Sequence, residues 1–408
     1  MIKINKTRLR EKVRSFSRFG DNGNGGITRL SLSEPALQAR KELICRCRKL
    51  GMEIKTDDLG DIYAIRKGTE DLPAIVMGSH LDSVVNGGNY DGVLGVLTGL
   101  EVIETLCAGN RPTRHPVGVM VWTNEEGARF DPAMMCSGIV TGHFDKDTMM
   151  HSKDPEGVCF GEALAESDFA GSRENRLNPR DYAGYLELHI EQGPVLETMK
   201  KEIGVVSGVV GMVNYEFTVT GVSDHAGTTP QKTRRDALYA ASGVIVKLWD
   251  ELEKIDDELV FTMGRLNVHP NVHTVIPDEV RFTLDARHQS PGIIRKVVEV
   301  IKNLPHEVKG CSVEAKELWA RDTVEFDKPF VDAVRDASDE LGCSYLEMYS
   351  GAGHDAQYVA GYVPCGMIFV PSHNGHSHCP EEYTPIELCA NGANVMLNAL
   401  LALDVKKS

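Results

Sequence analysis

The chain has 408 residues, of which 42% are hydrophobic and 25% are charged, and its 44 Lys and Arg against 59 Asp and Glu give a formal net charge of −15. These values exclude intrinsic disorder, a collagen-like chain and a small disulfide scaffold, and the length suggests two or three domains. No apolar run approaches the ~20 residues of a membrane span. The acidic balance argues against nucleic acid or an anionic membrane as a partner.

The N-terminal residues and the cysteines indicate a soluble, cytoplasmic protein. Residues 1–16 lack the apolar core of a signal peptide and predict a basic amphipathic helix. The ten cysteines include no Cys-x-x-Cys pair, and the two closest, Cys45 and Cys47, are spaced Cys-x-Cys. A structural zinc ribbon needs two tight pairs, which are absent. Because a disulfide framework is not expected in a chain of this length without a secretion signal, we expect reduced and mostly buried thiols.

Apolar strands and helical stretches alternate through the first part of the chain. The pattern predicts strands at 72–80, 116–127 and 184–193, and a helix that begins after Gly92. This alternation is typical of an α/β architecture. Polar side chains gather where each expected strand ends, which is the edge at which open α/β sheets bind ligands.

A different pattern begins near residue 209. Residues 214–227 and 278–288 alternate between apolar and polar side chains, as half-exposed antiparallel strands do. The other elements expected in this stretch are two helices and a closing strand, at 230–255, 291–304 and 311–318. The resulting order β-α-β-β-α-β predicts a small sheet with two helices.

The α/β pattern then returns, with a helix expected at 329–342 and a strand at 365–372. We therefore expect two domains. A discontinuous catalytic domain would consist of residues 1–208 and 325–408, and an inserted domain would consist of residues 209–324. The sequence contains no internal repeat or low-complexity tract that would suggest another architecture.

Seven polar residues stand at or near the expected strand ends: His80, Asp82, Asp91, Glu125, Glu126, His189 and His378. Histidine nitrogens together with carboxylate oxygens suit zinc, manganese or cobalt, and a bridging carboxylate can hold two ions. Of two consecutive glutamates, one can ligate while the other takes a proton from metal-bound water. Each feature alone is more often an ordinary polar strand end or loop, but their joint placement predicts a metal site.

His80 and Asp82 are two residues apart at the end of an expected strand, so their side chains point to the same face. A carboxylate in this position can orient a metal-binding histidine through its other ring nitrogen. We therefore expect Asp82 to support His80 rather than to bind metal itself.

Eight motifs follow one another in the order in which a known enzyme family has them: GSHLDS, NGGNYDG, TNEEGARF, HIEQGPVLE, SDHAGTTP, LDARH, SGAGHDA and PSHNGHSH. From about residue 30 onwards the sequence resembles the dinuclear metal amidohydrolases, which comprise allantoate amidohydrolase, N-carbamoyl-L-amino-acid hydrolase and β-ureidopropionase. These belong to a wider group with aminoacylases and metallo-carboxypeptidases. The resemblance implies a mixed-sheet catalytic domain of the phosphorylase/hydrolase type, interrupted by a smaller ferredoxin-like α+β domain that acts as a lid and forms a homodimer.

The resemblance also implies how two divalent ions would be held. His80, Asp91 and His189 would bind the first ion, and Asp91 would bridge to a second ion bound by Glu126 and His378. Zinc or manganese is expected at these sites, and cobalt or nickel would also suit the ligands.

The remaining roles implied by the resemblance concern the substrate. Glu125 would act as general base on a hydroxide that bridges the ions, with Asp82 in support. His225 would polarise the reacting carbonyl, and Gln192 and Arg287 would bind the substrate. The substrate is expected to be a small molecule with a carboxylate group.

Arg287 has a role that its chemistry supports independently, because a guanidinium group binds a carboxylate through two hydrogen bonds. The alternative is a surface strand residue that pairs with Asp285 or Glu279. His354 and Asp355 likewise have two interpretations: they lie near the site in the family, or they form a turn that positions the following helix.

Two departures from the family pattern affect substrate recognition. Thr274 stands where the family has an asparagine that touches the substrate carboxylate, and His376 stands where an aliphatic residue is common. His376 would contact the substrate or pack beside the strand. The leading hypothesis is therefore hydrolysis of the C–N bond of an N-carbamoyl amino acid or an allantoate-like substrate. The alternatives are a dipeptidase or N-acyl-amino-acid deacylase on the same scaffold, and a non-catalytic metal-binding protein.

Overall fold

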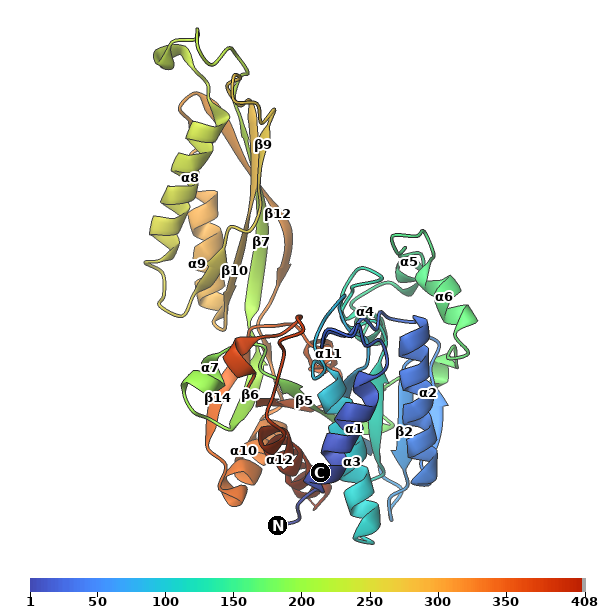
Figure 1. Cartoon of the computed structure of the whole chain (residues 1–408). Coiled ribbons are helices and arrows are strands. Elements are labelled where there is room, and N and C mark those ends of the chain that lie inside the picture. Colours follow the sequence, from blue (N-terminus) through green and yellow to red (C-terminus); the bar gives the residue numbers. More distant parts are fainter. Residues whose placement is uncertain (406–408) are drawn as a thin grey trace. The chain divides into compact units, whose positions relative to one another are not determined.

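A computed structural model describes residues 1–405 of the protein (Figure 1). The chain forms two compact units: unit 1 is Met1–Gly208 with Glu325–Ser408, and unit 2 is Val209–Val324. Each unit has its own sheet and its own helices. The mixed α/β class expected from the alternating pattern is confirmed.

A nine-stranded mixed sheet forms the centre of unit 1, in the order β1-β2-β4-β3-β5-β15-β6-β13, with β14 paired to β6. Its strands are β1 Glu53–Thr56, β2 Ile62–Arg66, β3 Ala74–His80, β4 Val117–Trp122, β5 Tyr182–Ile190, β6 Ile203–Val209, β13 Val324–Glu325, β14 Tyr345–Ser350 and β15 Cys365–Val370. Strands β4, β3, β5 and β15 run parallel to one another. Their carboxyl ends therefore lie at one edge of the sheet, where we expected the polar residues to gather.

The helices of unit 1 pack around this sheet. They are α1 Lys6–Ser17, α2 Glu34–Lys49, α3 Val93–Ala108, α4 Met135–Val140, α5 Lys146–Met150, α6 Phe160–Glu166, α7 Val195–Thr198, α10 Lys328–Leu341, α11 Asp355–Val359 and α12 Ile386–Val405. Helix α3 is buried along most of its length and packs on β3, β4 and β5. Helix α12 is long and apolar enough to cross a membrane by length and composition alone, but it packs on α3, α10 and β15 as a core helix does.

The basic helix expected at the N-terminus is α1, and it is fastened to α3 by buried charges. Lys12 Nζ lies 2.6 Å from carboxylate oxygens of both Glu101 and Glu104, and Arg8 forms two hydrogen bonds with Glu101. The side chains of Lys12 and Glu101 are almost fully buried, with exposed fractions of 3% and 0%. The basic residues of α1 therefore serve to hold one helix of unit 1 against another.

Unit 2 contains an antiparallel sheet in the order β11-β12-β7-β10-β8, with β9 also paired to β10. Its elements are β7 Gly211–Thr220, α8 Ala237–Leu252, β8 Val260–Thr262, β9 Leu266–His269, β10 Glu279–His288, α9 Pro291–Lys302, β11 Glu307–Val308 and β12 Cys311–Arg321. Both helices cover the same face of the sheet (Figure 1). The stacked rings of Phe217 and Phe282, with centroids 4.7 Å apart, lie in the core between sheet and helices.

Two elements of unit 2 are shorter than the sequence pattern suggested. The strand expected at 214–227 ends at Thr220, so that His225 lies in a loop. The helix expected from residue 230 begins at Ala237, because the side chain of Asp236 accepts hydrogen bonds from two backbone N–H groups of the first turn and caps the helix there.

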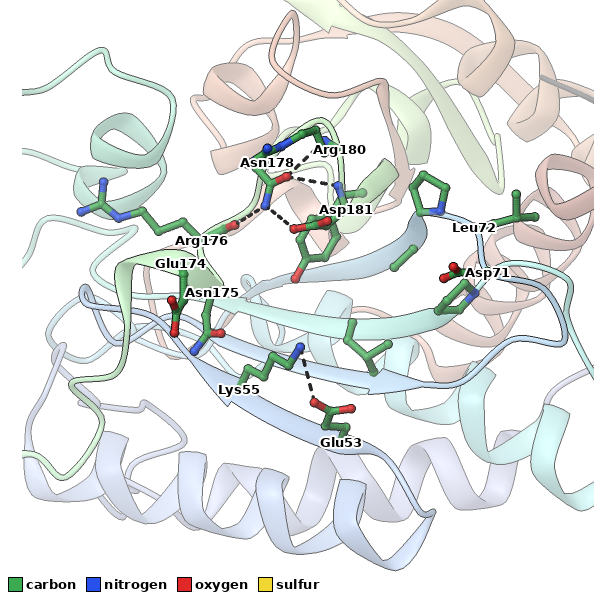
Figure 2. Close-up of a pocket in the computed structure, with 15 residues that line it drawn as sticks. Glu53, Lys55, Asp71, Leu72, Glu174, Asn175, Arg176, Asn178, Arg180 and Asp181 are labelled. Carbon is green, nitrogen blue, oxygen red and sulfur yellow. Dashed lines mark hydrogen bonds and ion pairs between the residues drawn. The ribbon is translucent and has the colours of Figure 1, made fainter.

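A pocket in unit 1 lies at the beginnings of the parallel strands, where Ala74 of β3 and Tyr182 of β5 line it (Figure 2). Its wall carries three basic and four acidic side chains, so that neither sign of charge dominates: Lys55, Arg176 and Arg180, and Glu53, Asp71, Glu174 and Asp181. Since the polar residues expected to bind metal follow the opposite ends of these strands, this pocket is separate from the candidate site.

Candidate metal centre

Two buried histidines at the carboxyl edge of the sheet present one ring nitrogen each to the candidate site. His80 ends β3 and His189 is the penultimate residue of β5. Nδ1 of His80 lies 3.0 Å from the carbonyl oxygen of Asp82, and Nδ1 of His189 lies 2.9 Å from that of Ile190. Because a carbonyl can only accept a hydrogen bond, each Nδ1 carries a proton, and in the neutral ring each Nε2 keeps a lone pair. Nε2 of His80 is buried without a hydrogen-bond partner, as suits a nitrogen that ligates a metal.

Asp91 faces both of these nitrogens with one of its carboxylate oxygens. Its Oδ1 lies 3.4 Å from Nε2 of His80 and 3.1 Å from Nε2 of His189. These three residues form a group whose ligand atoms all lie within 4.8 Å of one another. The next residue, Gly92, has φ = +63°, and a Cβ atom there would lie 2.2 Å from Nε2 of His80. Glycine at this turn therefore keeps the space beside the histidine open.

The other oxygen of Asp91 faces a second group. Its Oδ2 lies 3.2 Å from Nε2 of His378, which in turn lies 3.4 Å from Oε2 of Glu126. Asp91, Glu126 and His378 also form a group whose ligand atoms all lie within 4.8 Å of one another. Since Oδ1 and Oδ2 face different groups, the geometry of Asp91 suits a carboxylate that bridges two cations.

Glu125 lies beside the first group, on the turn that follows β4. Its Oε2 is 3.5 Å from Nε2 of His80, and the residue is only 8% exposed. The preceding residue, Asn124, has φ = +58°, and its side-chain amide donates to the carbonyl oxygen of Phe130 at 2.7 Å. This tight turn brings two consecutive glutamates to the site with different neighbours, Glu125 near His80 and Glu126 near His378.

Asp82 supports the site in another way than the sequence indicated. Its carboxylate oxygen is 3.8 Å from Nδ1 of His80, and the carbonyl oxygen of Asp82 accepts the hydrogen bond instead. The carboxylate accepts from the backbone N–H groups of Glu125 at 3.4 Å and of Glu126 at 3.2 Å. The side chain of Asp82 therefore braces the turn that carries the two glutamates, and its main chain orients His80.

The concentration of acids and histidines shifts their pKa values strongly. Burial raises the pKa of the Glu125 carboxyl well above its ordinary value, although the nearby His80 works against this rise. Burial and the neighbouring Asp91 raise the pKa of Glu126 to about 8.

The hydrogen bond to Asp91, opposed by burial, raises the pKa of His378 to about 9. Burial also disfavours the Asp91 carboxylate, but His189 and the other ring nitrogens outweigh it and hold the pKa of Asp91 well below its usual range. Divalent cations would relieve the same crowding of negative charge.

Two residues expected to bind substrate also belong to unit 1. Gln192, which has φ = +58°, donates from Nε2 to Oδ2 of Asp91 at 2.7 Å. Its own Oε1 is buried without a hydrogen-bond partner. His376 is exposed and lies two residues before His378. Gln192 therefore lies in the site, where it contacts a proposed metal ligand.

His225 and Arg287 belong to unit 2 and are described within that unit. Nδ1 of His225 accepts from the N–H groups of Gly227 at 3.0 Å and Thr228 at 3.2 Å, so that its Nε2 carries the proton when the ring is neutral. Arg287 pairs with Asp285, with Nε 2.7 Å from Oδ1, which is the pairing considered as its alternative role. The carbonyl oxygen of Thr274 accepts from the N–H of Ala226, next to His225.

The chain matches known proteins over nearly its whole length. Residues 76–402 match the family model described as "Peptidase family M20/M25/M40". The chain belongs to this family. It is 36% identical to an N-carbamoyl-L-amino-acid amidohydrolase of Paenarthrobacter aurescens, over 98% of this chain and 99% of the other. It is 33% identical to the allantoate amidohydrolase of Bacillus subtilis, over 98% of both chains.

A crystal structure of a hydantoinase/carbamoylase family amidase from Burkholderia multivorans has the same fold, with a TM-score of 0.90, 36% identity and full coverage of both chains. The fold and the family expected from the motifs are therefore confirmed. The M20/M25/M40 relationship supports a metal site at the two ligand groups that share Asp91.

Sequence reasoning missed two residues of the candidate site, Ser377 and Glu382. Both contact Asp91, Ser377 through its side chain and Glu382 through the backbone N–H of Asp91. The predicted metal site already brings the segments of Asp91 and His378 together, but nothing in the sequence shows that Ser377 and Glu382 are the residues of the second segment that contact Asp91. His354 also lies close to the site, with its ring centroid 4.4 Å from that of His189.

Proposed function

We propose that the protein is a metal-dependent hydrolase that cleaves the C–N bond of an N-carbamoyl amino acid or an allantoate-like substrate. The observation that carries the proposal is the position of Asp91, whose two carboxylate oxygens face two separate groups of metal-binding side chains. The names of the related amidohydrolases support the substrate class.

His80, Asp91 and His189 would hold one divalent ion, and Asp91, Glu126 and His378 the other. Zinc, manganese, cobalt and nickel all suit this set of nitrogen and oxygen ligands. When bound, two such ions lower the pKa of water toward neutrality and polarise a carbonyl group. The buried, partnerless Nε2 of His80 supports this assignment.

Glu125 is the general base in this proposal. It takes a proton from the attacking water and passes it to the departing nitrogen. Its burial and its raised pKa make the carboxylate a stronger base than an exposed glutamate. Asp82 holds the turn on which Glu125 stands, through the backbone hydrogen bonds already described.

Gln192 and His376 are the proposed substrate contacts of unit 1, and His225 and Arg287 have the substrate roles that the family resemblance implies for them. His225 in its Nε2–H form can donate to a carbonyl oxygen that becomes negative during the reaction. Arg287 offers a guanidinium group to the substrate carboxylate in competition with Asp285. Removal of the charge of Arg287 should therefore raise KM more than it lowers kcat.

We further propose a homodimer formed through unit 2, in a reducing compartment such as the cytoplasm. The outer face of α8 exposes a stripe of large apolar side chains, Leu238, Tyr239, Val246 and Trp249. All ten cysteines are unpaired, as suits a reducing compartment.

The test is a panel of N-carbamoyl amino acids, allantoate, N-acyl amino acids and dipeptides, given to protein reconstituted with each metal. We expect ammonia release from a ureido substrate, and we expect Glu125→Gln to reduce it by about 10²–10⁴-fold. Release of a free amino acid from dipeptides or N-acyl amino acids, without ammonia from any ureido substrate, would instead identify a peptidase or deacylase.

A further inference from the structure

Glu382 is a buried acid that joins the two loops of the second ligand group. It is 4% exposed and comes four residues after His378. Its Oε1 accepts hydrogen bonds from the backbone N–H groups of Tyr90 at 2.8 Å and Asp91 at 3.0 Å. Its Oε2 lies 3.0 Å from Oγ of Ser377. One carboxylate therefore holds the loop of Asp91 and the loop of His378 together.

We infer that Glu382 is a positioning residue that sets the geometry of the second metal site, formed by Asp91, Glu126 and His378. The inference rests on the proposed function, because it assumes that this group binds a cation. Glu382 does not contact the cation in this account. It acts through the backbone of Asp91 and through Ser377.

Ser377 connects Glu382 to the carboxylate that would bind metal. Its Oγ lies 2.9 Å from Oδ2 of Asp91, the oxygen that faces His378. Glu382 thus helps to fix the position of Asp91 in two ways. It accepts a hydrogen bond from the backbone N–H of Asp91, and it contacts Ser377, which in turn contacts Oδ2 of Asp91. Partners of metal ligands in this position change metal affinity by about 10–100-fold when they are removed.

The loop of Asp91 is shaped around the Glu382 side chain. A Cβ atom at Gly88 would lie 2.0 Å from Cδ of Glu382, so that glycine leaves the space the carboxyl group fills. Oε1 of Glu382 accepts hydrogen bonds from two N–H groups. Oγ of Ser377 lies between Oε2 of Glu382 and Oδ2 of Asp91, and its single proton can be donated to either oxygen. A glutamine can keep its oxygen on the two N–H groups only by turning its NH₂ group toward Ser377, and it lacks the negative charge of the carboxylate.

The two ligand groups differ in how much they depend on Glu382. His80 and His189 are buried, and each is oriented by a carbonyl oxygen of its own neighbourhood. The side chain of His378 is 50% exposed, and its backbone has φ = +57°. Because His378 lies on the loop that Glu382 fastens, a change at Glu382 should weaken the second site far more than the first.

The experiment is a calorimetric titration of the metal-free protein with Mn²⁺ and with Co²⁺. The variants are Glu382→Gln, the matched control Glu381→Gln at the exposed neighbouring position, and His378→Ala, which marks the second site. We expect two ions to bind to the unaltered protein and to Glu381→Gln. In Glu382→Gln we expect one ion to bind about 10–100-fold more weakly and the other to bind almost unchanged. The visible absorption of the single tightly bound Co²⁺ should match that of His378→Ala.

Each result has a separate meaning. Two ions bound to Glu382→Gln with unchanged affinities would overturn the positioning role and leave the proposed function intact. No ion bound to the unaltered protein would overturn the metal centre itself and the inference with it. If Glu382→Gln does not fold, as judged by circular dichroism, Ser377→Ala takes its place. Unchanged affinity for both ions in Ser377→Ala would then overturn the inference.

Discussion

At the scale of single residues, the site depends on which ring nitrogen of His80 and of His189 faces the other proposed metal ligands. The carbonyl oxygens of Asp82 and Ile190 assign the proton of His80 and His189 to Nδ1. In the neutral ring each Nε2 is thereby the atom that can bind a cation. This arrangement is set by residues one or two positions away in the sequence, and so it forms with the local backbone.

Gly92 provides a direct test of this preorganisation. In Gly92→Ala the new methyl group would displace the ring of His80, and we expect the affinity for the first ion to fall by about 10–100-fold. Gly51→Ala is the matched control, because Gly51 has φ = +72° and nothing within 4 Å of a Cβ atom. Gly51→Ala should destabilise the protein by about 1–2 kcal/mol through backbone strain. Gly92→Ala should cost more, because its backbone lies outside the left-handed helical region and its methyl group overlaps His80. Equal metal affinities in the two variants, measured by calorimetry, would contradict this role for Gly92.

The raised pKa values of the second group predict that metal binding releases protons. With the pKa of His378 raised to about 9 and that of Glu126 to about 8, both groups of the metal-free protein are protonated near neutral pH. A cation must displace these protons, so the apparent affinity should rise by about tenfold per pH unit for each proton, and level off above the higher pKa. The enthalpy of binding near pH 7 should therefore depend on the ionisation enthalpy of the buffer. Identical enthalpies in phosphate-free buffers of different ionisation enthalpy would rule out this linkage.

At the scale of elements, four parallel strands bring the site together. His80 and His189 lie at the ends of β3 and β5, Glu125 and Glu126 follow β4, and the loop with His378 follows β15. The apolar runs of the sequence predicted these strands, since buried parallel strands are uninterrupted in hydrophobicity. Two strands end earlier than expected, β4 at Trp122 and β5 at Ile190, before residues 127 and 193. The strand pattern therefore placed all seven polar residues in one region.

The contacts that the sequence did not predict join residues that are far apart in the chain. The contact between Glu382 and Asp91 depends on how β15 packs beside β5, which no local pattern encodes. The contact of Gln192 with Asp91 likewise depends on the left-handed backbone of Gln192 after the end of β5. Local patterns thus predicted the polar residues of the site, with Asp82 as a support, and the family resemblance assigned them to two ions, but neither predicted Ser377 or Glu382.

The buried ion pairs between α1 and α3 predict how a mutation of Glu101 changes the stability of the protein. Glu101→Leu would leave Lys12 buried with fewer opposite charges, and we expect the free energy of unfolding of unit 1 to fall by about 3–5 kcal/mol. The control is Glu387→Gln, because Glu387 pairs with Lys6 of α1 on the surface, with exposed fractions of 61% and 47%. Loss of this pair should change stability by less than about 1 kcal/mol. Urea denaturation of the metal-free protein compares the two, and equal losses would refute the buried-charge account.

At the scale of the whole molecule, the exposed stripe on α8 predicts a dimer. Light scattering should give about twice the 44.8 kDa of one chain. The double change Val246→Glu and Trp249→Glu should give a monomer, because it places charges on the stripe. Met199→Glu, at an exposed apolar residue of unit 1, serves as the control and should leave the dimer intact. A monomeric unaltered protein, or a double variant that remains dimeric, would refute dimer formation through α8.

The central claim is that this chain uses two cations to cleave a C–N bond. Its most direct test is the rate of ammonia release from a ureido substrate, measured as the metal-free protein is titrated with Mn²⁺ or Zn²⁺ and the bound ions are counted. We predict negligible release without metal and a plateau reached only when two ions are bound per chain. Equal ammonia release by the metal-free protein, or a plateau at one ion per chain, would contradict the claim.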